Sequence, residues 1–191
     1  MRGTLTLLRH PRVRMPGGTC YGRTDCAADA RHEQALLDEL LDTVSPQRVI
    51  TSPAQRCRTL AIRLCNRWQR PCEIEPRLHE MDFGCWEGLA WDAVPRAELD
   101  AWARQPLDHA PGGGESLRDM AGRVRAWVSE VATSQSDVLA VTHGGVMRLL
   151  SVWSQGESLA SVLDVQAPAF GQMLRFPLEG LRGALNAEHQ A

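Results

Sequence analysis

The sequence predicts an α/β fold, a three-layer sandwich in which a mostly parallel central sheet is flanked by helices. Three short apolar runs have the composition of buried strands, at residues 4–8, 48–51 and 138–142, and a helical pattern follows each of them. Strands that alternate with helices favour a parallel sheet, because each crossover helix returns the chain to the same edge. The 191 residues, of which 43% are apolar, suffice for one domain with a substantial core.

The clearest helix is predicted directly after the strand at 48–51. Ser52 is a suitable N-cap and Pro53 suits the first helical position. One face then carries apolar residues at helical spacing, namely Cys57, Leu60, Ala61, Leu64, Cys65 and Trp68. A second helix is predicted over residues 116–131, and a third after Gly144 and Gly145.

The remaining segments carry weaker patterns. Residues 85–115 contain three tryptophans and a Pro-Gly-Gly-Gly run, which is typical of a lid or insertion over the sheet edge, or of an ordinary loop. We expect residues 1–178 to form a single domain and residues 179–191 to form a polar C-terminal tail. The sequence carries no signal for an oligomeric state.

Composition excludes several classes of function. The chain has 23 acidic and 21 basic residues and a formal net charge of −2, which gives no reason to expect binding to nucleic acid or to an anionic membrane. Every basic residue is arginine, so a P-loop lysine and a Schiff-base lysine are both excluded. The six cysteines form no C-x-x-C pair, the N-terminal apolar run is short for a signal peptide, and no stretch reaches the roughly 18 apolar residues of a membrane span. We therefore expect a cytoplasmic protein with reduced thiols.

Polar side chains gather where the predicted strands end. Arg9 and His10 end the first strand, His143 ends the last, Arg56 lies in the first turn of the helix after the second, and Glu80 follows further along. Ligands of such sheets bind at the carboxyl ends of the strands. Each residue alone has an ordinary explanation, since a strand-end histidine is most often structural and an arginine or glutamate is most often solvated. Together, so many cationic donors would repel one another without an anion, and a phosphoryl group has the oxygens to satisfy them.

Five ordered motifs resemble those of one family. They are Leu8-Arg9-His10, TSPAQRCRTLA at 51–61, LHEMDFGCWEG at 78–88, PGGGES at 111–116 and VTHGG at 141–145. Over residues 4–150 the chain resembles the histidine phosphatase superfamily, also called phosphoglycerate mutase-like. The resemblance implies a phosphomonoesterase that needs no metal and no cofactor and acts on a small-molecule phosphate ester.

The resemblance also implies a role for each matching residue. His10 matches the nucleophile that forms a phosphohistidine, and Glu80 matches the proton donor to the leaving alkoxide. Asp82 and Glu87 are its rivals for this role, although we expect them to orient loops. Arg9, Arg56 and His143 match the phosphate-binding residues. The backbone N–H of Gly144 is expected to add a donor. A zinc site built from the histidines and a cysteine is the metal alternative, but no pair has ligand spacing.

Two features distinguish this chain within the family. Pro11 stands where the superfamily usually has glycine. One phosphate contact that the family makes in the loop after this position is therefore unassigned here, and Arg12, Arg14 or neither of them could supply it. Arg-His-Pro followed by TCYGRTD at 19–25 resembles the α-ribazole-5′-phosphate phosphatase branch, in which Arg23 could contact substrate or hold the loop through Asp25. We therefore predict hydrolysis of α-ribazole 5′-phosphate in cobalamin nucleotide-loop assembly. The alternatives are a broad-specificity phosphatase, a phosphoglycerate mutase-like enzyme, a protein phosphatase for phosphohistidine or phosphotyrosine, and a phosphate-binding pseudoenzyme.

Overall fold

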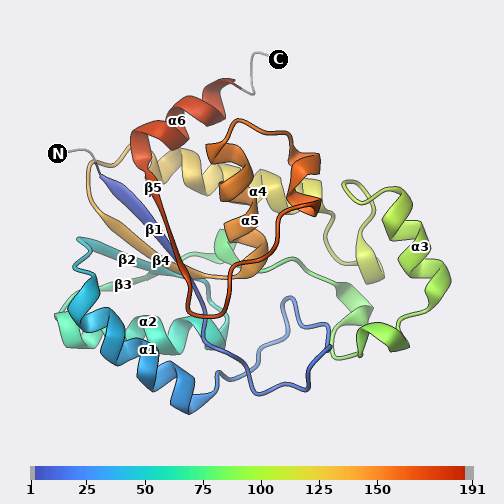
Figure 1. Cartoon of the computed structure of the whole chain (residues 1–191), viewed down its shortest axis with the longest axis horizontal. Coiled ribbons are helices and arrows are strands. Elements are labelled where there is room, and N and C mark those ends of the chain that lie inside the picture. Colours follow the sequence, from blue (N-terminus) through green and yellow to red (C-terminus); the bar gives the residue numbers. More distant parts are fainter. Residues whose placement is uncertain (1–2, 188–191) are drawn as a thin grey trace.

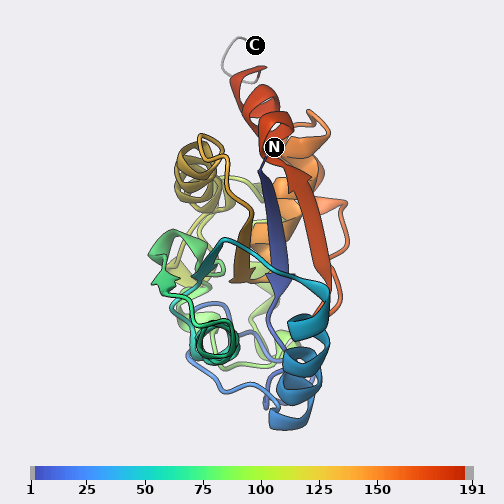
Figure 2. The same cartoon turned by 90° about the vertical axis from the view of Figure 1, so that its left-hand side faces the viewer.

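The computed structural model describes residues 3–187. Within them, a five-stranded sheet has the order β3-β2-β4-β1-β5. The strands are β1 (Thr4–Arg9), β2 (Arg48–Thr51), β3 (Cys72–Ile74), β4 (Val138–Thr142) and β5 (Met173–Pro177). The first four are parallel, and β5 is antiparallel to β1, beside which it lies in Figure 2.

Helices cover both faces of the sheet. In Figure 1, α1 (Ala30–Thr43) and α2 (Gln55–Trp68) lie below the strands, while α4 (Leu117–Val131), α5 (Gly144–Ser154) and α6 (Leu178–Ala187) lie above them. The sheet has a hydrophobic core on each face, and strand side chains alternate between these two cores, because successive strand residues point to opposite faces. Along β1, Leu5 and Leu7 join the core under α4 and α5, whereas Leu8 joins the core under α1 and α2. The predicted three-layer α/β fold is confirmed.

The predicted helix after β2 forms, but it begins later than Ser52. It starts at Gln55, and its N-cap Ala54 has no side-chain oxygen to accept a backbone N–H of the first turn. The Ser52 hydroxyl is occupied by the ring of His143, and the Asp25 carboxylate instead accepts the backbone N–H of Gln55 at 2.6 Å. The predicted apolar face is buried in, or packed against, the core under α1 and α2.

The expected polar tail is wrong for residues 179–187. These residues belong to α6, and its Leu178, Leu181 and Leu185 are buried against the core under α4 and α5. Their spacing of three and four residues places them on one helix face. Residues 188–191 of the expected tail lie outside the described residues.

The middle segment is ordered and has a small core of its own. It comprises α3 (Arg96–Arg104) and three short 3₁₀ helices (Gly84–Trp86, Trp91–Ala93 and Pro111–Gly113), which extend to the right of the sheet in Figure 1. Trp86 is buried, and its indole N–H donates to Glu98 at 2.6 Å. That this segment moves as a lid stays a prediction. Within residues 3–187, no helix has the length and apolar character needed to cross a membrane.

Candidate active site

Strand pairing brings the two histidines together. Arg9, the last residue of β1, lies opposite Thr142, the last residue of β4, and the backbone N–H of His10 donates to the Thr142 carbonyl at 2.9 Å. His143 follows directly, and the two imidazole centroids lie 5.2 Å apart. Parallel pairing of β1 and β4 therefore positions both side chains at the carboxyl end of the sheet.

His10 is held as a neutral imidazole with Nε2 unprotonated. Its Nδ1 lies 2.7 Å from the Pro11 carbonyl oxygen, which can only accept, so Nδ1 carries the proton. Burial and the charge of Arg56 lower the pKa of His10 to about 3. At neutral pH the ring thus presents an unprotonated Nε2, which is the form that a nucleophile requires.

His143 is also neutral, with its proton on the other nitrogen. A guanidinium only donates, so Nδ1 of His143 accepts from Arg56 at 3.2 Å, and Nε2–H donates to the Ser52 hydroxyl at 2.8 Å. The ring is fully buried, and burial followed by the charge of Arg56 lowers its pKa well below the usual range.

Arg56 is fixed by the backbone of the preceding loop. It is fully buried, and its terminal nitrogens donate to the carbonyls of Gly22 at 2.6 Å and Thr24 at 2.8 Å. Arg9 donates to the Pro168 carbonyl at 2.5 Å, and its guanidinium lies 4.0 Å from the centre of the Phe170 ring. The Nε atoms of both arginines are buried and have no hydrogen-bond partner among residues 3–187. Two fixed cations with spare donors form a site suited to an oxyanion.

Glu80 lies against the N-terminus of α5. Its carboxylate accepts the backbone N–H of Gly145 at 3.0 Å and that of Met81 at 3.1 Å. A Cβ at Gly145 would lie 2.2 Å from Oε1 of Glu80, so this approach requires glycine. Glu80 also lines a cavity of about 400 Å³ together with Arg9 and Gly144. Arg9, Glu80 and Gly144 thus line this cavity, whereas His10, Arg56 and His143 are buried, are joined to one another by the contacts above, and are not among its lining residues.

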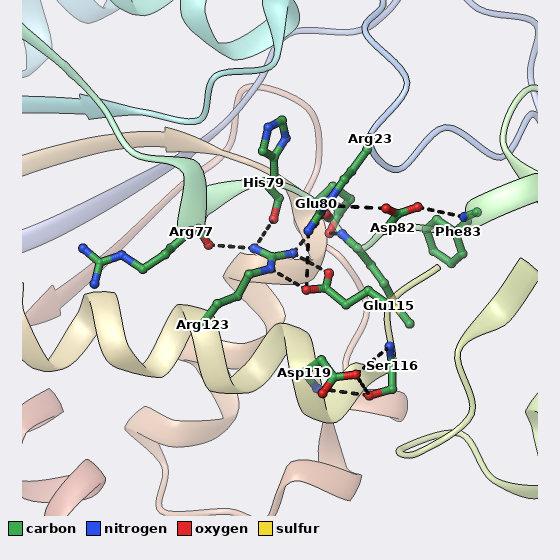
Figure 3. Close-up of polar contacts among 12 residues, drawn as sticks. Arg23, Arg77, His79, Glu80, Asp82, Phe83, Glu115, Ser116, Asp119 and Arg123 are labelled. Carbon is green, nitrogen blue, oxygen red and sulfur yellow. Dashed lines mark hydrogen bonds and ion pairs between the residues drawn. The ribbon is translucent and has the colours of Figure 1, made fainter. Parts of the chain in front are cut away.

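Arg123, on α4, holds the loop that carries Glu80, and sequence reasoning missed it. Figure 3 shows its guanidinium surrounded by the carbonyl oxygens of Arg77, His79 and Glu80, at 2.6, 2.7 and 3.0 Å. The Glu115 carboxylate completes the cluster with two bonds of 2.7 Å. Glu115 lies in the PGGGES motif, which was the available signal, but the motif does not identify its partner.

The comparisons with known proteins decide the family. The family model of the histidine phosphatase superfamily (branch 1) matches residues 5–172. The chain belongs to this superfamily. It is 33% identical over 163 residues to a glucosyl-3-phosphoglycerate phosphatase of Mycolicibacterium vanbaalenii, covering 77% of this chain and 72% of the relative. It is 30% identical over 154 residues to the adenosylcobalamin/alpha-ribazole phosphatase of Escherichia coli, covering 76% of each chain.

Solved structures agree with the match. A mycobacterial glucosyl-3-phosphoglycerate phosphatase superposes with a TM-score of 0.78 at 26% identity, covering 92% of this chain and 90% of the other. The alpha-ribazole phosphatase of Shigella flexneri superposes with a TM-score of 0.75 at 28% identity, covering 90% and 89%. This histidine phosphatase is therefore a phosphoric monoester hydrolase with the phosphoglycerate mutase-like fold.

The loop after His10 differs from what the motif led us to expect. The guanidinium nitrogens of Arg23 lie 3.6 Å from a carboxylate oxygen of Asp82 and 3.6 Å from one of Glu115. The Asp25 carboxylate instead accepts the backbone N–H of Gln55 at the start of α2. The alternative in which Arg23 holds the loop through Asp25 is therefore wrong. A contact between Arg23 and substrate stays a prediction. Of the two candidates for the open phosphate contact, Arg12 shares a second cavity with Arg9, of about 460 Å³, whereas Arg14 does not line it.

Proposed function

We propose that this histidine phosphatase hydrolyses small-molecule phosphate monoesters through a phosphohistidine at Nε2 of His10. The observation that carries the proposal is the contact of 2.7 Å between Nδ1 of His10 and the Pro11 carbonyl oxygen, which leaves Nε2 as the free nitrogen. Burial and the charges of Arg56 and Arg9 lower the pKa of the ring and favour its neutral form. The fixed guanidinium groups of Arg9 and Arg56 supply the charge that a phosphoryl group needs during transfer.

The reaction then proceeds in two displacements. Nε2 of His10 attacks phosphorus, the ester P–O bond breaks, and protonated Glu80 gives its proton to the departing oxygen. In the second step the Glu80 carboxylate takes a proton from water, the water oxygen attacks phosphorus, and the P–N bond breaks. The net change is ester plus water to alcohol plus inorganic phosphate, and both side chains return to their initial states.

Trapping the intermediate tests this chemistry. Rapid mixing with a ³²P-labelled ester, followed by an alkaline quench that preserves phosphohistidine, should give labelled protein whose label maps to His10. With labelled p-nitrophenyl phosphate, whose leaving group needs no acid, Glu80→Gln should accumulate more label, because its second step lacks a base. Wild-type levels of label or turnover in His10→Asn would overturn the mechanism.

For the substrate, we propose α-ribazole 5′-phosphate. The Arg-His-Pro sequence with TCYGRTD supports it, as do the relatives named for alpha-ribazole. Glucosyl-3-phosphoglycerate is the second candidate, because relatives named for it are up to 33% identical.

A comparison of kcat/KM separates these candidates. The panel holds both esters, 3-phosphoglycerate, sugar phosphates and p-nitrophenyl phosphate, without added metal. A preference of about a hundredfold for one ester, or about 2.7 kcal/mol of differential transition-state binding, assigns the substrate. A flat profile would identify a broad-specificity phosphatase, and isomerisation of 3-phosphoglycerate would identify a mutase.

A further inference from the structure

The cavity beside Glu80 has an apolar wall that the phosphoryl chemistry does not use. Its polar lining includes Arg9, Glu80 and Gly144. Its apolar lining comes from separate parts of the fold, namely Phe83, Trp102 of α3, Leu117 and Met120 of α4, and Val162 and Leu163 of the 3₁₀ helix Leu159–Leu163. The volume of about 400 Å³ is in the range of small-molecule sites.

One further cation lines this cavity. Arg148, on α5, donates from a terminal nitrogen to the Val162 carbonyl, while its Nε is buried and has no partner among residues 3–187. A buried donor without a partner is costly, so a ligand that offers an acceptor gains from meeting it. Burial lowers the pKa of Arg148.

We propose that this cavity binds the leaving group of the substrate and selects a largely apolar, aromatic group that presents a hydrogen-bond acceptor to Arg148. The inference rests on the proposed function, since Glu80 protonates the bridging oxygen and the rest of the alcohol must extend from that point. A fully hydroxylated leaving group would bury its hydroxyls against Phe83, Trp102 and Leu163 without partners, which is unfavourable. An aromatic ring would bury apolar area there instead.

A matched pair of esters isolates this selection. Ribose 5-phosphate and benzimidazole riboside 5′-phosphate share the same bridging oxygen and the same alkoxide, so the ratio of their kcat/KM values reports only the distal ring. We expect a preference of at least tenfold for the benzimidazole riboside over ribose 5-phosphate and over glucosyl-3-phosphoglycerate. A ratio near one, or a preference for the glucosyl ester, would overturn the inference.

Variants locate the selection in the cavity. Leu163 is 45% exposed, so Leu163→Gln adds polarity to the wall without emptying the core, and it should lower the riboside preference at least threefold. Arg148→Met should raise the KM for the riboside at least fivefold. Ile62→Gln is the matched control, because Ile62 is 40% exposed on α2, away from the cavity, and its ratio should equal that of wild type. An unchanged ratio in Leu163→Gln together with an unchanged KM in Arg148→Met would place the selection elsewhere.

The phosphohistidine chemistry and the assignment of the cavity can be tested separately. Trapped phosphohistidine with p-nitrophenyl phosphate reports on the chemistry alone. If the label forms but the ester ratio is near one, the assignment of the cavity and of an aromatic riboside substrate is wrong, while the phosphohistidine chemistry stands. If no label forms at His10, the proposed function fails first.

Discussion

The reactivity proposed for His10 depends on its neighbour in the sequence. The Pro11 carbonyl accepts the Nδ1 proton, and this bond decides which nitrogen is free. The superfamily usually has glycine at position 11, and the replacement leaves the orienting contact intact, because it uses the backbone carbonyl and not the side chain. The proline instead changes the loop that follows it. In that loop Arg12, and not Arg14, lines a cavity together with Arg9.

Glu80→Gln should separate substrates by their leaving groups. An amide cannot donate the proton as a carboxylic acid does, so kcat for alkyl phosphates should fall about 10²- to 10³-fold. For p-nitrophenyl phosphate, whose phenolate leaves without protonation, the rate constant of the p-nitrophenol burst, which reports the first step, should fall less than tenfold. Stopped-flow measurement of both substrates tests this, and equal losses in their first step would point to another acid.

Gly145→Ala should impair the acid without unfolding the protein. The added methyl group would lie 2.2 Å from Oε1 of Glu80, so the carboxylate must leave the Gly145 N–H. We expect kcat for alkyl phosphates to fall at least tenfold, with little change in Tm. Gly122→Ala on α4, where the new Cβ meets no atom within 4 Å beyond its chain neighbours and the backbone of its own helix, is the control and should gain about 1 kcal/mol of stability at full activity. Identical kinetics in the two variants would contradict the positioning of Glu80 by α5.

At the scale of elements, α4 acts on the reaction through Arg123. This side chain binds three carbonyls of the loop 77–80 and the Glu115 carboxylate, and the Thr142 hydroxyl donates to the Leu78 carbonyl at 3.0 Å. The loop is thus tied both to a helix and to the end of β4. Glu80 has a fixed place because two elements hold its backbone.

Arg123→Met should reproduce part of the Glu80→Gln phenotype. The three carbonyls lose their donor, so the loop loosens and kcat for alkyl phosphates should fall at least tenfold. The loss on p-nitrophenyl phosphate should be smaller, which a purely structural defect would not produce. Arg118→Met serves as the control on the same helix, since Arg118 is exposed and pairs with Asp108. A uniform loss on both substrates in Arg123→Met would reduce its role to stability.

Sequence patterns sufficed where local rules decide the structure. β2 and β4 have the predicted bounds, and α4 has Ser116 as its N-cap, with the capping box that its sequence allows. Patterns failed where a distant contact decides, as at Ser52, whose hydroxyl is occupied by a histidine 91 residues away. Arg123 went unrecognised for the same reason, because its partners are carbonyls that carry no sequence signal. α6 was missed because Gly180 and Gly183, which disfavour a helix, stand between the leucines that form its apolar face.

On the scale of the whole molecule, two buried neutral histidines make stability depend on pH. The unfolded chain takes up a proton on His10 near pH 6.5, whereas the folded protein does so only near pH 3. Unfolded protein therefore binds more protons between these values, and stability is present above pH 6.5 and is lost as the pH falls. For His10 alone the loss from pH 7 to pH 5 is about 2 kcal/mol, and His143 adds a loss of the same sign.

Urea unfolding at pH 7 and pH 5 measures this dependence. The free energy of unfolding of wild type should drop between the two conditions, and the drop in His10→Gln should be smaller by about 2 kcal/mol. An equal drop in both proteins would mean that His10 titrates normally in the folded state.

The prior anchoring of Arg56 has a consequence for the end of the catalytic cycle. Its guanidinium is already held by the Gly22 and Thr24 carbonyls, so little freedom remains to be lost when an anion arrives. Free inorganic phosphate meets the same prepared donors as the ester does. We therefore expect phosphate to inhibit competitively, and its departure to limit turnover when good substrates are saturating. Where inorganic phosphate is abundant, the rate of this enzyme would fall as phosphate rises, and the enzyme would respond to its product as well as to its ester.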